Sequence, residues 1–380
     1  MRGSPEVVAG YRPWLDGVRA GAIAMVVVQH AWGTMPIDLG NGGVGVFFAL
    51  SGYLITSLLL DGRARDGSVS LPAFYLRRAG RLVPALVLVL VVCDILFLIA
   101  GDHAPLKGSV AALTYTANYA EILDSDFVVG FGPTWSLAVE EHFYLLWPLC
   151  LLGVTRRWGL RTALWATLAV CAGALVWRTI LATIHAPEDM LALGSLERAD
   201  ALLYGCAAAI AVRLGWRPRA WMVWPGLAFV AFAVVAFGGT AGYPALVIGT
   251  AILAVGAAAV VVCLDYAPVL WMRRLLSVRA VLTIGILSYG IYLWHGPAMR
   301  VAADFGYEGR IWRAVVAILV VAVAAVSYHF LEVPARSQAR RWADRLAKSR
   351  GTGADVPIAE IQDRVVLEGA GGTGPATRSN

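Results

Sequence analysis

Long apolar runs, each close to the length of a membrane span, recur along this chain and are separated by short polar loops. A helix needs about 20 apolar residues to cross a bilayer. The pattern therefore predicts an all-α, polytopic membrane protein with about ten transmembrane helices. The predicted spans are 14–33, 43–60, 82–100, 133–154, 163–184, 196–213, 220–239, 244–264, 280–301 and 311–331.

Charged residues alternate between successive loops. Arginines fill the loops after the second, fourth, sixth and eighth spans and the segment after the tenth, whereas the other loops carry mainly Asp and Glu. Positively charged loops stay on the cytoplasmic side. Both termini are therefore predicted to be cytoplasmic. Adding or removing one span would invert every later loop and destroy the alternation.

Composition supports the membrane assignment and argues against other classes. The 380 residues are 59% hydrophobic and 15% charged, which is too apolar for a soluble domain. The net charge of +6 is spread over short loops, so membrane lipids are predicted as partners and nucleic acid is not. The five cysteines lie in or beside apolar segments, so we expect no disulfide framework, no metal site and no bound cofactor.

The chain divides into a membrane domain, residues 1–335, and a C-terminal segment, 336–380, that is first basic and then disordered. The first apolar segment has no recognisable cleavage site, and we interpret it as a retained helix. We expect a multi-pass protein of the inner (plasma) membrane, and self-association into a homo-oligomer is compatible with the pattern.

The first span carries two ionisable residues, Arg19 and His30. Eleven residues are nearly a whole number of helical turns, so both side chains share one face, about 16 Å apart along the axis. Ionisable groups in membrane helices usually face a protein interior or a wet cavity. We expect Arg19 near the cytoplasmic mouth and a buried, neutral His30 available as a base. The alternative is a satisfied core histidine beside an interfacial arginine.

The fourth span places Glu140 and Glu141 at a depth comparable to that of His30. Adjacent residues on a helix point about 100° apart, so the two carboxylates face different neighbours. One is predicted to reach the reacting centre while the other locks helices together. A purely structural role for both is the alternative.

A basic cluster, Arg77, Arg78 and Arg81, precedes the third span. Arginines on one helical turn can bind phosphate groups, although anchoring on the cytoplasmic side explains them equally well. Together with Arg19, the cluster favours a polyphosphate ligand on the cytoplasmic side.

Two further sets of polar residues occur in the later spans. Tyr292 and His295 lie on one inward stripe of the ninth span, and either acceptor binding or an aromatic belt explains them. Arg198 and Asp200 open the sixth span, where a buried ion pair either serves the site or only fastens helices.

These segments together resemble the acyltransferase family 3 of integral-membrane O-acyltransferases, which acylate polysaccharides, lipid-linked sugars and some antibiotics. The resemblance covers about residues 11–335, and Arg19 with His30 fits the family's Arg-x10-His signature. The other matching blocks, in order, are GVFFALSGYLIT (45–56), FYLRRAGRLVPAL (74–86), PTWSLAVEEHFYLLWP (133–148), LSYGIYLWHGP (287–297) and HFLEVPAR (329–336). One departure is His142, where the family usually has Gln.

The resemblance implies ten transmembrane helices, a catalytic His30 and cytoplasmic acyl-CoA as the donor substrate. His30 would act as a general base or carry the acyl group transiently, and the acceptor would be a carbohydrate, a glycolipid or a glycosylated small molecule. Ser51 and Trp135 lie in two of the matching blocks and are assigned to support of the acceptor. Members that act on cell-envelope glycans often carry an added esterase-like domain, which we do not expect in these 380 residues.

Two other functions compete with an acetyl or other short-chain acyl transferase. A glycolipid transporter or flippase would also bury charges, but many transporters show paired halves, and the unusual residues here concentrate in spans one, four and nine. A helical scaffold would leave His30 and the paired acids unexplained.

Overall fold

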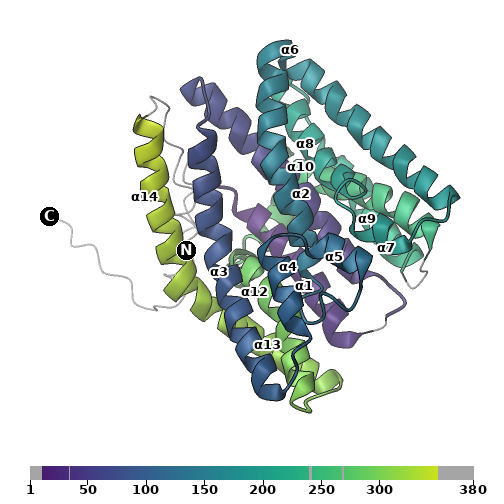
Figure 1. Cartoon of the computed structure of the whole chain (residues 1–380). Coiled ribbons are helices and arrows are strands. Elements are labelled where there is room, and N and C mark those ends of the chain that lie inside the picture. The colour runs from purple at the N-terminus through teal and green to yellow at the C-terminus, as the bar shows by residue number, and fades with distance from the viewer. Residues whose placement is uncertain (1–10, 34, 239–241, 268, 350–380) are drawn as a thin grey trace.

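The computed structural model describes residues 11–33, 35–238, 242–267 and 269–349, and in these ranges it contains helices and no strand (Figure 1). The N-terminal part contains α1 (Pro13–Trp32), α2 (Leu39–Asp66), α3 (Leu71–Ala100), α4 (Pro105–Leu113), α5 (Ala117–Leu123) and α6 (Thr134–Thr183). The middle contains α7 (Glu188–Leu193), α8 (Ala199–Arg213), η1 (Ala220–Met222), α9 (Val223–Ala236), η2 (Ala245–Gly249) and α10 (Thr250–Tyr266). The C-terminal part contains α11 (Leu270–Leu276), α12 (Arg279–Asp304), α13 (Arg310–Ser327), η3 (Tyr328–Glu332) and α14 (Val333–Ser349).

The all-helical class is confirmed, and each of the ten apolar segments overlaps a helix. By length and apolar content, five of the described helices can cross a membrane, or six if α11 and α12, which are bent by 65° at their junction, count as one span. The helix α1 is not among them, because its polar residues lower its mean hydropathy. The count of ten spans and the cytoplasmic placement of the termini stay predictions.

The long helix α6 contains two of the predicted spans. Gly159, with φ 87° and ψ 174°, interrupts its helical geometry, and α6 folds back on itself near the top of Figure 1. Glycine reaches this backbone region without steric cost. The arm 134–158 therefore runs to the corner and the arm 160–183 returns from it.

Small residues bring the central helices into close contact. A Cβ on Gly52 would lie 1.9 Å from the carbonyl oxygen of Leu202, so α2 and α8 touch through their backbones. A Cβ on Gly285 would lie equally close to the carbonyl oxygen of Asp16, where α12 crosses α1. Such glycines allow the close helix approach that is common in membrane proteins. The helix α1 is thereby held between α2 and α12.

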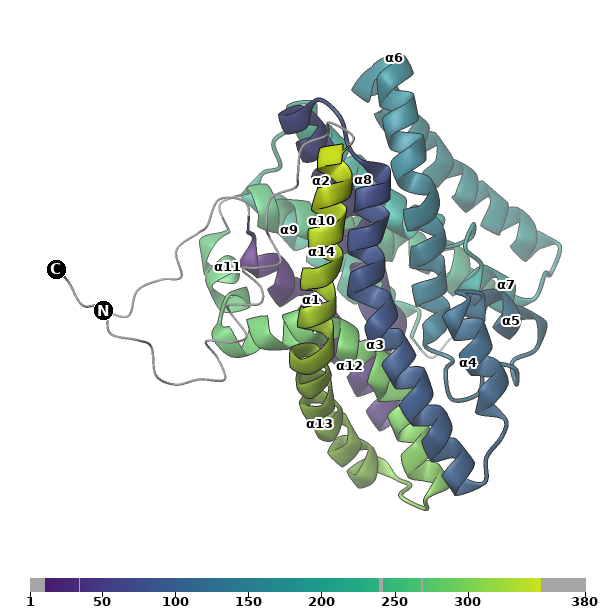
Figure 2. The same cartoon turned by 60° about the vertical axis from the view of Figure 1, so that its left-hand side comes forward.

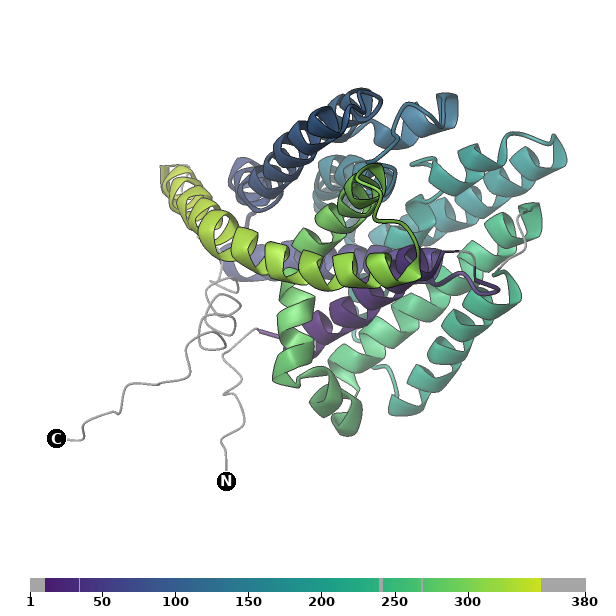
Figure 3. The same ribbon diagram turned by 90° about the horizontal axis from the view of Figure 1, so that it is seen from below.

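The helices α13 and α14 are joined through the π-helix η3 into one curved rod, seen from below in Figure 3. The helices α14 and α3 lie side by side (Figures 1 and 2), and Ala339 of α14 packs on Gly80 of α3. The predicted basic segment after residue 335 thus begins as a helix. The predicted domain boundary stays a prediction, and residues 350–380, which include the predicted disordered tail, lie outside the described residues.

Candidate active site

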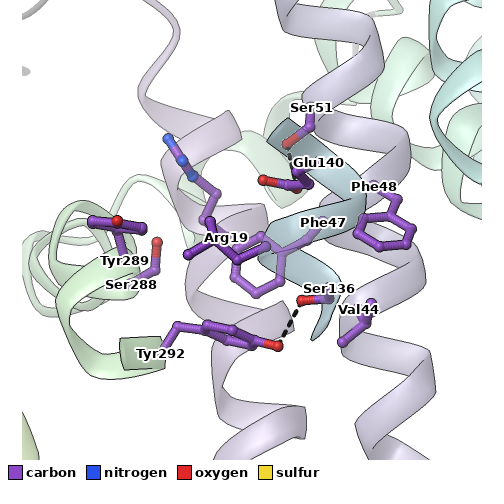
Figure 4. Close-up of a pocket in the computed structure, with 11 residues that line it drawn as sticks. Arg19, Val44, Phe47, Phe48, Ser51, Ser136, Glu140, Ser288, Tyr289 and Tyr292 are labelled. Carbon is purple, nitrogen blue, oxygen red and sulfur yellow. Dashed lines mark hydrogen bonds between the residues drawn. The ribbon is translucent and has the colours of Figure 1, made fainter. Parts of the chain in front are cut away.

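A narrow pocket of about 60 Å³ lies among α1, α2, α6 and α12 (Figure 4). It is the place where the first, second, fourth and ninth predicted spans meet. Polar and aromatic side chains line most of it. The lining residues are Arg19, Val44, Phe47, Phe48, Ser51, Ser136, Leu137, Glu140, Ser288, Tyr289 and Tyr292.

The pocket lies between the levels of Arg19 and His30 on α1. Gly285 of α12 touches the backbone of Asp16, close to Arg19, and His295 of α12 touches His30. The three α12 residues that line the pocket, 288, 289 and 292, fall between these two crossing points. The stretch of α1 between its arginine and its histidine therefore runs beside the pocket.

The two adjacent acids of α6 have different partners. Glu140 lines the pocket and accepts a hydrogen bond of 2.9 Å from the Ser51 hydroxyl (Figure 4). Glu141 accepts hydrogen bonds from Arg78 at 2.7 and 3.1 Å, and the Arg78 guanidinium also stacks on Tyr144. Glu141 therefore fastens α6 to α3, whereas the contact of Glu140 with the reacting centre stays a prediction.

The arginines of α3 do not form one cluster. Arg77 lies 3.5 Å from Asp344 of α14, and Arg78 is held by Glu141. Arg81 lies close enough to Arg19 and Arg336 that they repel its charge, and its Nε has no hydrogen-bond partner among the described residues. Residues on one helical turn thus face different neighbouring helices, and binding of the donor by the three arginines stays a prediction.

His30 is exposed, so the expectation of a buried imidazole is wrong. The reason is its place in the last turn of α1, at the end of the bundle. Its Nδ1 lies 2.8 Å from the carbonyl oxygen of Val26, and because that oxygen can only accept, Nδ1 carries the proton. The ring meets His295 edge-to-face, with centroids 4.8 Å apart. A backbone carbonyl, and neither Glu140 nor Glu141, thus orients His30.

The predicted polar stripe of α12 does face inward. His295 is fully buried, and its Nδ1 donates to the carbonyl oxygen of Tyr292 at 2.6 Å. Its Nε2 has no hydrogen-bond partner among the described residues. The Tyr292 hydroxyl contacts Ser136 and donates to the carbonyl oxygen of Pro133, both at 2.6 Å. Tyr292 lines the pocket, and the His295 ring contacts both Tyr292 and His30.

The expected ion pair between Arg198 and Asp200 is wrong. Asp200 instead pairs with Arg178 of α6 through two hydrogen bonds of 2.9 and 2.6 Å, and both side chains are buried. Arg198 lies against the rings of Phe48 and Trp135. The two residues face different ways because Arg198 precedes the first turn of α8 and Asp200 lies within it.

Three residues near the site were not singled out from the sequence. Arg336 is buried, pairs with Glu332 at 2.7 Å and lies close enough to Arg81 to repel its charge. Arg336 and Glu332 both belong to the HFLEVPAR block, and this block was the feature of the sequence that could have identified them. Glu121 of α5 lies outside the spans, and burial together with nearby Asp189 raises its pKa to about 7.

Within the described residues, no group of three His, Cys, Asp or Glu side chains has the arrangement of a metal site.

Comparison with known proteins points to one family. A family model described as an acyltransferase domain matches residues 12–331. The peptidoglycan O-acetyltransferase OatA of Listeria monocytogenes is 31% identical over 365 residues, which cover 86% of this chain and 56% of that protein. The O-acetyltransferase OatA of Staphylococcus aureus strain NCTC 8325 is 28% identical over 378 residues, covering 90% and 60%. The chain therefore spans little more than half the length of these relatives. No solved structure matches the chain.

Proposed function

The chain belongs to the acyltransferase family 3, and from this premise we propose that it transfers an acyl group, most simply acetyl, from acyl-CoA to a carbohydrate hydroxyl at the membrane. The names of its relatives, which act on peptidoglycan or are O-acetyltransferases, support a carbohydrate polymer as the acceptor. The observation that carries the proposal is the pocket between Arg19 and the His30–His295 pair, with the Glu140 carboxylate in its wall.

The donor enters from the arginine end in this proposal. Neither Arg19 nor Arg81 is held by a close carboxylate. The only ion pair of Arg19 in the described ranges is a long one, 3.8 Å from Asp16, and no ion pair of Arg81 is found there. Phosphate groups of the coenzyme would bind these guanidinium groups, because arginine donates two parallel hydrogen bonds to such oxyanions. The thin thioester arm would extend through the pocket, which must widen to admit it, toward His30. Arg78 holds Glu141 in place and acts through it.

His30 is the general base of the reaction. Its Nδ1–H donates a hydrogen bond to the Val26 carbonyl oxygen, so the free lone pair of the base lies on Nε2. Nε2 takes the proton of the acceptor hydroxyl while that oxygen attacks the thioester carbonyl. The thiolate leaves and receives the proton, giving an ester and free coenzyme thiol. His295, edge-to-face with His30, holds the ring in position.

The test is thiol release by the purified full-length chain in detergent, with acetyl-CoA and a sugar acceptor. We expect thiol release that depends on the acceptor, and His30→Ala should lower it about 100- to 10,000-fold, the usual contribution of a general base. His103→Ala, at an exposed site after α3, is the matched control and should keep full activity.

Near-normal turnover in a folded His30→Ala variant would remove the mechanism. A glycolipid flippase would release no thiol at all, so the same assay separates the transferase from that competing function.

A further inference from the structure

A second and larger pocket, of about 260 Å³, opens at the other end of the bundle from the α3 arginines. We call it the α2–α7 pocket, because Asp38 and Asn41 at the start of α2 and Glu188 and Asp189 of α7 supply its polar wall. The apolar wall includes Phe237 after α9. The pocket is thus bounded by an acidic side and an apolar side to which Phe237 contributes a ring.

This pocket lies at the same end of α1 as His30. Gln29, the residue before His30, accepts a hydrogen bond of 3.0 Å from the backbone N–H of Leu39, which follows Asp38. The Asp38 carboxylate in turn caps the start of α2 by accepting from the N–H of Asn41 at 3.0 Å. The loop between α1 and α2 therefore joins the base to the pocket wall.

Arg198 lies directly behind that wall. It is 2% exposed, its Nη2 reaches the Asn41 side-chain oxygen at 3.5 Å, and Asp38 attracts its charge. Its Nε has no hydrogen-bond partner among the described residues, and nearby Asp200 is already committed to Arg178. A buried guanidinium with an unused N–H is costly unless another group satisfies it.

Arg198 also connects the two pockets. Its guanidinium faces the ring of Phe48, which lines the narrow pocket, while Asn41 on its other side lines the α2–α7 pocket. Arg198 itself lines neither pocket, so it links the walls of the two pockets through Asn41 and Phe48.

The chemistry of the wall selects a class of ligand. The carboxylates of Asp38, Glu188 and Asp189 accept hydrogens from hydroxyl or ammonium groups and repel anions. The Phe237 ring can cover the apolar C–H face of a sugar ring, as aromatic side chains pack on apolar surface. The pocket therefore fits one sugar unit that is neutral or carries an amine.

We propose that the α2–α7 pocket is the acceptor site, which binds a hydroxyl-rich sugar unit without net negative charge and places its hydroxyl toward His30. This inference deepens the proposed function and rests on it. Asp189 and Glu188 bind the sugar at the mouth, and Arg198 positions Asn41 and Asp38 at the inner end.

Direct binding tests the site without requiring catalysis. The probes are three disaccharides, N,N′-diacetylchitobiose (neutral), its deacetylated amine form and a uronic-acid disaccharide, and the full-length chain in detergent is observed by saturation-transfer NMR. We expect the first two to bind and the third not to bind. Asp189→Asn should weaken binding of the amine form about tenfold, and Glu308→Gln, at an exposed site before α13, should change nothing.

Equal binding of the uronic-acid probe, or unchanged binding in a folded Asp189→Asn variant, would overturn the acceptor site. The transfer assay gives a second readout, in which Asp189→Asn and Arg198→Lys should raise the acceptor KM and leave the acyl-CoA KM unchanged. If sugars bind as expected but no acyl group is ever transferred, the proposed function fails while the sugar site stands. If acyl transfer occurs and neither substitution changes the acceptor KM, the acceptor site is wrong while the proposed function stands.

Discussion

A single backbone contact determines which nitrogen of the His30 imidazole carries the proton. The Val26 carbonyl fixes the proton on Nδ1 and leaves Nε2 free, while His295 fills the space beside the ring. This arrangement differs from a Ser-His-Asp type of triad, in which a carboxylate holds the base. The two acids of α6 are therefore available for other roles. Glu140 lies in the pocket wall and accepts a hydrogen bond from Ser51, and Glu141 forms an ion pair with Arg78.

The substitutions Arg81→Ala and Arg77→Ala should distinguish a role in donor binding from a role in anchoring α3 at the surface. Removing Arg81 takes away a guanidinium that has no carboxylate partner in the described part of the chain, so Arg81→Ala should raise the acyl-CoA KM about 10- to 100-fold, the loss of one charge-assisted hydrogen bond to phosphate. Arg77→Ala is the control, because Arg77 faces Asp344 of α14. Steady-state kinetics with varied acyl-CoA measure both. An effect on acceptor KM alone would assign Arg81 to the other substrate.

Glu121 should make stability depend on pH. Its pKa is raised from 4.5 to about 7 by burial and by Asp189, so the folded protein holds this proton more tightly than the unfolded chain. Stability from this group is full below pH 4.5 and is lost as the pH rises to about 7. Because the side chain is only partly buried, we expect a loss of about 1 kcal/mol.

The variant Glu121→Gln removes this titration. It should melt at a higher temperature than the wild type at pH 8, and the difference should shrink or reverse at pH 5. Thermal melts in detergent at both values measure it. If the difference in melting temperature between the variant and the wild type is the same at pH 5 and pH 8, the prediction for Glu121 is wrong.

At the scale of helices, the site depends on backbone contact between α2 and α8. The two helices bring Ser51, Phe48 and Arg198 to one level, and they approach so closely that Gly52 has no space for a side chain. Likewise the Arg78–Glu141 pair links α3 to α6. The pocket is therefore a product of helix spacing.

Gly52→Ala should destabilise the protein by about 1–3 kcal/mol or more, because its Cβ would overlap the Leu202 carbonyl and force the helices apart. Gly173→Ala of α6 is the matched control, because a Cβ added there would meet no neighbouring atom within 4 Å. Thermal unfolding of the two variants gives the comparison. A Gly52→Ala protein as stable as the control would contradict the close packing of α2 and α8.

At the scale of the whole molecule, the two pockets follow one another along α2, the α2–α7 pocket beside residues 38–42 and the narrow pocket beside residues 44–51. The narrow pocket reaches toward Arg19 and the α2–α7 pocket opens beside the α1–α2 loop. A donor and an acceptor that enter from different ends can be bound at the same time. Direct transfer by a general base then requires both substrates together.

Initial-rate kinetics should therefore give intersecting lines in double-reciprocal plots. A transiently acylated His30 would give parallel lines and a burst of thiol in the absence of acceptor. The measurement is thiol release at varied concentrations of both substrates. Parallel lines would replace the general base with the acylated histidine.

The amino-acid sequence by itself determined the helical class, the segments that meet at the site and the different directions in which Glu140 and Glu141 point. These follow from apolar run length and helical periodicity, which are local properties of the chain. The same local rules placed Arg19 and His30 on one face of α1 and Tyr292 with His295 on one face of α12.

Only the tertiary structure decided which groups meet. Asp200 pairs with Arg178 and not with Arg198, Arg77 faces Asp344 of α14 while Arg81 lies near Arg19 and Arg336, and His30 is exposed at a helix end. Each outcome depends on which helix lies alongside and how closely the glycines let it approach, and these are contacts between residues far apart in the chain. A charge is neutralised by whatever lies within a few ångströms of it in space, and helical periodicity carries no information about that neighbour.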